Sequence, residues 1–297
     1  MSVSTFNTPA PIAVALELYV ANVRFAVSDR PDTIVEVRPS DPNKAADIKA
    51  AENTRVGYDA GTRTLSIISR KRVNRLTGVS GKRPESIDVV IQLPTDSEVR
   101  GTAGVGDFRS DGALGSFSLK TDLGTVQLAE TGPLNLRSGA GKIVVEGVSG
   151  SAEVHNSAGD IQIGAVDGTA DLSAGNGKVQ LGAVTGAASL KNSNGSVAVD
   201  CALSDITAAT SNGAVRIGEV VRGKVSASSK NGSVEVGVRE GSAAWLELNT
   251  LVGRVHNELA DSDAPEAGEP VDKVEVHADT KLGDITIRRA PGLEDEA

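Results

Sequence analysis

The sequence has a single cysteine, Cys201, and aromatic residues make up only 2% of its 297 residues. One cysteine excludes an intramolecular disulfide framework and is typical of a reducing compartment. The scarcity of aromatic side chains argues against a thick globular core, in which Phe, Tyr and Trp supply much of the buried area. The apolar residues are mostly Val, Ile, Leu and Ala, which suit a narrow core between β-strands.

Long apolar runs are also missing. No run of about 18 apolar residues occurs, so the sequence predicts no membrane span. The N-terminal residues lack the basic region followed by an apolar region that marks a signal peptide. The apolar segment 12–20 contains Glu17 and is too short to cross a bilayer. We therefore expect a cytoplasmic protein.

Positive charge is in deficit, and the net charge of -9 argues against nucleic acid or an anionic membrane as the main partner. One segment, 70–83, reverses this balance. Its six cations are Arg70, Lys71, Arg72, Arg75, Lys82 and Arg83. We interpret the segment as a loop between two strands, which either binds an acidic protein partner, nucleic acid or anionic lipid, or is merely solvated. It has no interleaved aromatic residues, and this weakens a nucleic-acid interpretation further.

Glycine, by contrast, is abundant, and nine glycines recur at steps of 17 to 21 residues. They are Gly106, Gly124, Gly141, Gly159, Gly177, Gly195, Gly213, Gly232 and Gly253. Apolar residues recur two and four positions after most of these glycines, and again seven and five positions before them. A spacing of two places each pair on one face of a strand. A short fixed period predicts stacked supersecondary units, here two strands per coil.

The predicted fold is an all-β parallel solenoid of about 18 residues per coil over residues 101–290. An asparagine precedes four of the repeat glycines, at Asn176, Asn194, Asn212 and Asn231. Asn-Gly pairs favour tight turns, and stacked asparagines can bond to one another from coil to coil. After Gly253 the next matching unit begins at Gly283. We interpret the acidic stretch 257–272 between them as a loop, and 291–297 as a disordered tail.

Residues 1–100 lack the period but still have strand character. We expect them to form an antiparallel β cap that contains the 70–83 loop and seals the first coil. The predicted strands are 14–20, 22–27, 33–38, 63–69 and 86–93, and the one predicted helix is 43–52.

The repeat motif G-[DKST]-[VI]-x-[VIL], the opening F-N-T-P and the strand I-D-V-V-I-Q-L-P resemble the bacterial putative-adhesin family of β-strand repeat domains. The resemblance covers roughly residues 5–290. It implies a β-solenoid in a domain of unknown function, often in bacterial proteins with a membrane anchor or secretion signal. It implies no catalytic residues.

Candidate chemistry is sparse. His155, His256 and His277 fall on outward positions in different columns, and Trp245 is alone. Glu153 and Asp171 occupy the same position on successive coils with His155 two residues along, a set that either binds a divalent ion or is simply solvated. We predict no catalytic residue, cofactor or metal.

We therefore expect a non-enzymatic scaffold or protein-interaction module whose partner and oligomeric state are unknown. The alternative is a carbohydrate-active or metal-dependent enzyme on a solenoid face. A third hypothesis is self-association through an open end of the solenoid.

Overall fold

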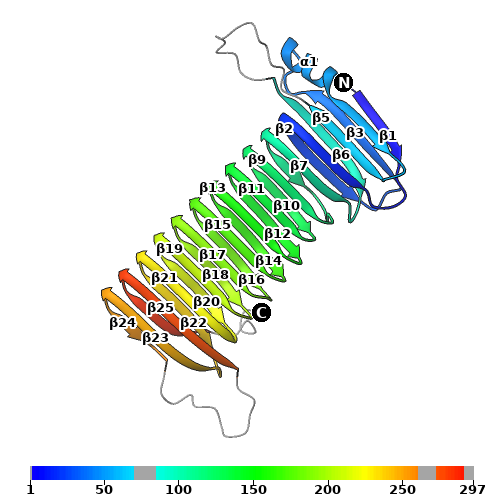
Figure 1. Cartoon of the computed structure of the whole chain (residues 1–297). Coiled ribbons are helices and arrows are strands. Elements are labelled where there is room, and N and C mark those ends of the chain that lie inside the picture. Colours follow the sequence, from blue (N-terminus) through cyan, green and yellow to red (C-terminus); the bar gives the residue numbers. More distant parts are fainter. Residues whose placement is uncertain (1, 70–84, 260–271, 291–297) are drawn as a thin grey trace. The chain divides into compact units, whose positions relative to one another are not determined.

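The computed structural model describes residues 2–69, 85–259 and 272–290. The segments 70–83 and 291–297, and residues 260–271 of the predicted acidic loop, therefore lie wholly outside the described residues. The chain forms two compact units, Met1–Val145 and Glu146–Ala297, which are considered separately below. In both units the strands lie side by side in stacked coils (Figure 1).

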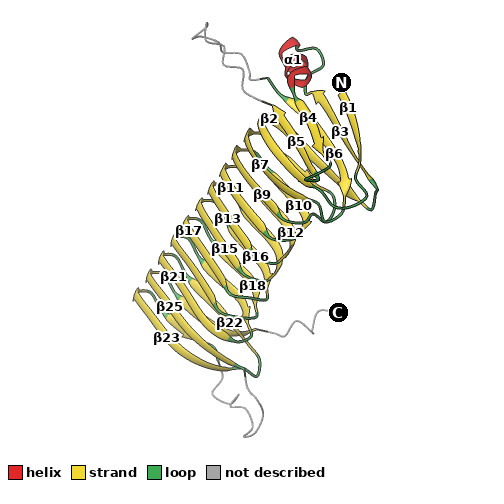
Figure 2. Cartoon of the chain, turned by 45° about the vertical axis from the view of Figure 1, so that its right-hand side comes forward, coloured by secondary structure: helices red, strands yellow, loops and turns green. Residues whose placement is uncertain are grey.

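Unit 1 contains eleven strands and one helix among its described residues, and a twelfth strand, β12 (Ile143–Ser149), crosses into unit 2. The elements are β1 (Ser2–Asn7), β2 (Ala13–Ser28), β3 (Asp32–Pro39), α1 (Ala45–Asn53), β4 (Arg55–Asp59), β5 (Thr64–Ser69), β6 (Ile87–Pro94), β7 (Glu98–Val105), β8 (Phe108–Ser110), β9 (Phe117–Leu123), β10 (Val126–Thr131) and β11 (Leu134–Ala140). The predicted helix is confirmed as α1 (Figure 2).

The predicted antiparallel cap is confirmed in the pairs β1–β3, β3–β6 and β4–β5. The two strands predicted at 14–20 and 22–27 are instead one strand, β2. Its first half pairs in parallel with β5 and β7, and its second half pairs in parallel with β6 and β8. The N-terminal β2 thus forms a coil of its own, inserted between the coil β5–β6 and the coil β7–β8.

Unit 2 is built from fourteen further strands among its described residues. They are β13 (Ala152–Ala158), β14 (Ile161–Asp167), β15 (Ala170–Asn176), β16 (Val179–Val184), β17 (Ala188–Asn194), β18 (Val197–Ala202), β19 (Ile206–Asn212), β20 (Val215–Val220), β21 (Gly223–Asn231), β22 (Val234–Arg239), β23 (Ala243–Val252), β24 (Val255–Asn257), β25 (Lys273–Leu282) and β26 (Ile285–Ala290). Odd-numbered strands form one parallel sheet and even-numbered strands the other.

The apolar pairs predicted from the repeat form the core between these two sheets. Ile161, Ile163, Leu172 and Val179 are almost fully buried, and Ile161 lies in register with Val179 on the next coil. Burial alternates over the first four residues of β14 and of β16, as expected when every second side chain points inward. The predicted parallel β-solenoid is confirmed.

The repeat glycines are required because successive coils approach closely at these turns. A Cβ atom on Gly195 would lie 1.9 Å from the carbonyl oxygen of Gly177, and Gly195 has a φ of 132°. No other residue fits this combination of contact and backbone conformation.

Buried polar side chains three positions before the glycines hold these turns together. Asn192, Thr210 and Ser229 donate to the carbonyl oxygens of the repeat glycines one coil back, at 2.7, 2.9 and 2.9 Å. We did not predict this column. The asparagine ladder that we did predict is confirmed, because each amide from Asn194 to Asn231 donates to the preceding asparagine at 2.8–2.9 Å.

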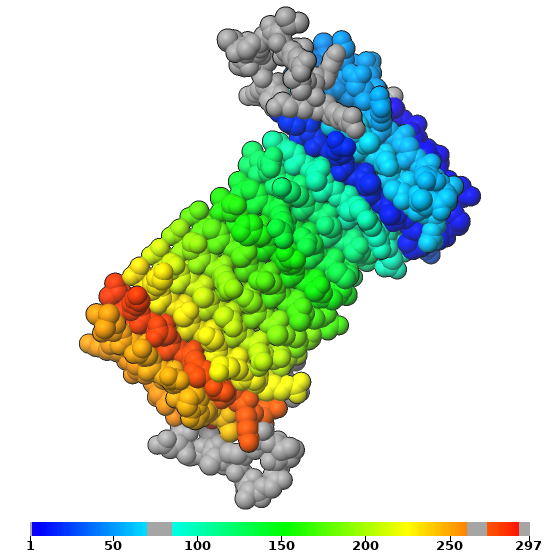
Figure 3. Space-filling view, viewed as in Figure 1, coloured from blue at the N-terminus to red at the C-terminus, as the bar shows by residue number. Residues whose placement is uncertain are grey.

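The last coils do not stack in chain order. Thr280 Oγ1 donates to the Gly232 carbonyl at 2.9 Å, and Thr250 Oγ1 donates to the Gly283 carbonyl at 3.0 Å. The segment β25–β26 therefore lies between β21–β22 and β23–β24, and appears as a red band between yellow and orange in Figure 3. Asn257 stands at an inward position that is apolar in most coils, and in this outermost coil it is exposed to water.

Candidate interaction surface

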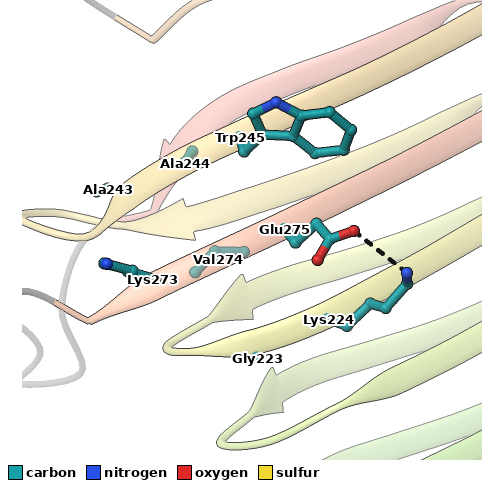
Figure 4. Close-up of a pocket in the computed structure, with 8 residues that line it drawn as sticks. All are labelled: Gly223, Lys224, Ala243, Ala244, Trp245, Lys273, Val274 and Glu275. Carbon is teal, nitrogen blue, oxygen red and sulfur yellow. Dashed lines mark hydrogen bonds and ion pairs between the residues drawn. The ribbon is translucent and has the colours of Figure 1, made fainter.

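The sole tryptophan of the sequence projects from the outward face of the outermost coil, β23–β24. Trp245 on β23 is 57% exposed, an unusual fraction for so large an apolar side chain. Glu275 on β25 is its register partner, and Lys224 on β21 is the register partner of Glu275. Three adjacent strands thus present an aromatic ring, a carboxylate and an ammonium group in one row (Figure 4).

A hollow of about 700 Å³ lies beside this row. The residues that line it are Gly223, Lys224, Ala243, Ala244, Trp245, Lys273, Val274 and Glu275. Gly223, Ala243 and Ala244 have little or no side chain, and this leaves an open space between the larger side chains around them. The row and this hollow together are called the Trp245 surface below.

His277 on β25 supports the tryptophan. Its Nδ1 lies 2.8 Å from Glu247 Oε2, and its Nε2 lies 2.5 Å from Glu275 Oε1. The centroid of its ring lies 5.3 Å from that of Trp245, with the two rings steeply inclined. Glu247 and Glu275 bond to opposite ring nitrogens of His277 and hold its imidazole in place. The imidazole in turn packs against the indole of Trp245.

Glu275 links the two sides of the surface. Its Oε1 also lies 3.2 Å from Lys224 Nζ. The hydrogen bond with His277 and the interaction with Lys224 hold the pKa of the Glu275 carboxyl below its ordinary value, so that it is ionised at neutral pH. An exposed aromatic side chain beside paired charges of both signs is suited to binding a ligand. It is poorly suited to acid–base chemistry, because both nitrogens of His277 are already engaged.

The predicted candidate residues are brought together only in part. Glu153 and Asp171 are register partners as expected, but His155 Nδ1 bonds to Ser173 Oγ at 2.7 Å. Within the described ranges, no group of three or more His, Cys, Asp or Glu side chains is arranged to hold a metal ion. His256 is exposed on β24. The six cations of the predicted partner-binding loop, Arg70, Lys71, Arg72, Arg75, Lys82 and Arg83, all fall outside the described residues.

Trp245 is the single tryptophan of the sequence, and its contacts with Glu275 and His277 were not predicted. β23 and β25 would be neighbours in either stacking order, but the observed order places Glu275 between Trp245 and Lys224 and leaves β23 at the edge of its sheet. The polar Asn257 at an inward position was a faint sequence signal for an end coil.

Comparisons with known proteins found one family and several solved structures. The model of the family Toastrack DUF4097 matches residues 15–288. A crystal structure of a putative adhesin from Parabacteroides merdae is 14% identical, with 96% of this chain and 95% of that chain covered and a TM-score of 0.38. A putative cell adhesion protein from Clostridium sporogenes is 11% identical, with 97% and 99% covered and a TM-score of 0.28.

No curated protein matches the sequence. Among the described residues, no helix combines the length and the apolar character needed to cross a bilayer. The family model spans most of the sequence, and the observed parallel solenoid is the architecture that the repeat predicted. The chain belongs to the Toastrack DUF4097 family of β-solenoid domains.

Proposed function

We propose that this chain is a non-enzymatic interaction module that binds another protein through the Trp245 surface. The observation that carries the proposal is the 57% exposure of a tryptophan that packs against the ring of His277. Tryptophan is enriched among the residues that dominate binding energy in protein interfaces. A side chain already held in place loses little conformational entropy on binding.

The charges around Trp245 support a protein partner, because this chain then contributes an apolar anchor surrounded by polar groups. Lys224 and Lys273 supply hydrogen-bond donors and Glu247 supplies acceptors around the indole and the hollow. An enzyme is less well supported, because His277 already bonds to two carboxylates.

The basic segment remains a second proposed contact, in which its cations bind acidic groups of the same partner. We also propose a cytoplasmic location, where a buried thiol such as Cys201 stays reduced. Cell fractionation with an antibody against the chain tests that location. Recovery outside the cytoplasm would overturn it.

The binding proposal is tested by affinity capture from native lysate with the wild type, Trp245→Ala and Leu123→Ala. Leu123 on β9 is a matched control, since it is an exposed apolar side chain that is not part of the Trp245 surface. We expect a specific protein that is lost with Trp245→Ala and kept with Leu123→Ala. A fourth variant, with Arg70, Lys71, Arg72 and Arg75 changed to Ser, tests the basic segment. Equal capture by the wild type and Trp245→Ala would refute the role of the Trp245 surface.

A further inference from the structure

β23 is an edge strand with little protection against pairing. It pairs with β25, and no other strand of the described residues pairs with it. Its ten residues, A-A-W-L-E-L-N-T-L-V, include no Lys, Arg or Pro, the residues that usually block edge-to-edge association. The edge strand β4 in unit 1 differs, because it has five residues and carries Arg55 and Asp59 at its ends.

The backbone of β23 offers a regular set of hydrogen-bonding groups. Ala243 N donates to Asp272 O at 2.9 Å, which sets the alternation of the parallel ladder. In such a ladder alternate residues bond to the same neighbour. Trp245 and Glu247 therefore face β25 with their backbone groups, and Leu246 and Leu248 direct theirs toward the free edge.

The core is also incomplete at this edge. Leu246 and Leu248 point inward but are only half-buried, and Val255 on β24 is 44% exposed. One coil back, Val276 is the register partner of Leu246 and Ile285 is the register partner of Val255, and both are fully buried. The terminal layer of aliphatic side chains has a packing neighbour on one side only, so covering it would remove apolar surface from water.

We infer that a second copy of this chain covers the edge, with the two β23 strands antiparallel about a two-fold axis at Leu248. In this register Leu248 lies opposite Leu248 of the second copy, and Trp245 lies opposite Leu251, which is 78% exposed. Glu247 then lies opposite Asn249, which can donate a hydrogen bond to it. Centring the pair on Glu247 would instead place two carboxylates face to face, which is unfavourable.

The symmetry favours a closed dimer. A two-fold axis uses the same strand on both copies, so that no free β23 edge remains and no fibre grows. The segment 260–271 is a poor alternative occupant by sequence, since it has four carboxylates, two prolines and one branched aliphatic residue. Neither its prolines nor its charges suit a strand that completes an apolar layer.

This inference goes beyond the proposed partner binding and centres on Leu248, which is not part of the Trp245 surface. Trp245 lies at both contacts, but the hollow beside it lies toward β25 and β21, whereas the second copy lies against the opposite edge of the strand. Binding to a partner and dimerisation can therefore be separated by mutation.

Cysteine crosslinking of purified full-length protein tests the register directly. In a Cys201→Ala background, Leu248→Cys places two thiols opposite each other, at a Cα separation of about 5.5 Å that suits a disulfide. Leu246→Cys is the matched control, an inward half-buried leucine of the same strand that lies opposite Thr250 in the dimer. We expect mild oxidation to give a covalent dimer with Leu248→Cys and at least tenfold less with Leu246→Cys.

Sedimentation equilibrium gives an independent measure. We expect the wild type to approach twice its 30.4 kDa mass with rising concentration, and Leu248→Lys to stay monomeric with an unchanged circular dichroism spectrum. A wild type that is monomeric throughout, mass that grows beyond the dimer, or equal crosslinking by both cysteine variants would overturn the inference. So would dimerisation only after 260–271 is replaced by a Gly-Ser linker, since that segment would then be the natural cover. Loss of dimerisation with partner capture intact would leave the proposed function standing.

Discussion

Thr280 Oγ1 donates to the carbonyl oxygen of Gly232 at 2.9 Å, across 48 positions of sequence. The same bond joins Ser229 to Gly213 and Thr210 to Gly195, so Thr280 occupies the position of the coil that follows Gly232. The coil β23–β24, which comes next in the chain, does not stack on β21–β22. The following coil, β25–β26, occupies that position instead. This order places Glu275 between Trp245 and Lys224 and leaves β23 at the edge of its sheet.

The stacking order can be tested with paired cysteines on outward positions. Ser228 and Asp279 are register partners, about 5 Å apart at Cα, whereas Ser228 and Asn249 are two strands apart, about 9.6 Å. In a Cys201→Ala background, we expect Ser228→Cys with Asp279→Cys to form an intramolecular disulfide, and Ser228→Cys with Asn249→Cys to remain reduced. Mass spectrometry after mild oxidation distinguishes them. The reverse result would mean that the coils stack in chain order.

The repeat itself was predictable because each coil has the same local structural requirements. Positions such as Ile161 and Val179 must be apolar, and Gly195 must lack a Cβ, so residues of the same type recur in the sequence at every period. The stacking order at the ends is a non-local choice between similar coils. The polar Asn257 at an inward position is the available sequence signal for it, and it is a faint one. The place of Glu275 between Trp245 and Lys224 depends on that choice and could not be predicted from the spacing of the repeat.

The close contact at the repeat glycines predicts a large cost for adding one methyl group. Gly195→Ala would place Cβ 1.9 Å from the Gly177 carbonyl oxygen, and we expect the free energy of unfolding to fall by about 3 kcal/mol. Gly241→Ala is the control, because Gly241 has a φ of 80° but no atom within 4 Å of the added Cβ. We expect it to cost about 1 kcal/mol from backbone strain. Urea denaturation measures both, and equal losses would show that the contact is not limiting.

An ion pair on the buried carboxylate of Glu219 predicts unequal losses of stability in a second pair of variants. Glu219 is 4% exposed, and its Oε1 lies 2.6 Å from Arg239 Nε. Arg239→Met removes the nearby guanidinium from a buried carboxylate, and we expect a loss of about 3 kcal/mol in the free energy of unfolding at pH 7. Arg216→Met removes an exposed partner of Glu235 at 3.7 Å and should cost under about 1 kcal/mol. Adding Glu219→Gln to Arg239→Met should recover part of the loss, and failure to do so would contradict this account.

The only thiol should be inert in the folded protein. Burial and the neighbouring Glu219 raise the pKa of Cys201, which lowers the fraction of reactive thiolate. We expect Cys201 to react with a thiol reagent at pH 8 at least a hundredfold more slowly in the native protein than in urea. Absorbance of the released thiolate follows the reaction. Rapid labelling without urea would show that the coil around Cys201 opens readily.

The pH response of Trp245 depends on Glu275. Because interactions with His277 and Lys224 lower the pKa of Glu275 in the folded chain, their stabilising effect is present above the unfolded pKa and is lost as pH falls through the folded pKa. The pKa of an unperturbed Glu is 4.5, so we expect a step in Trp245 fluorescence below pH 4.5 as protonation of Glu275 releases His277. Glu275→Gln cannot protonate and should lack this step. Glu235→Gln, which changes a carboxylate of the other sheet, should keep it. A step of the same size and midpoint in all three proteins would mean that Glu275 does not control the position of the indole.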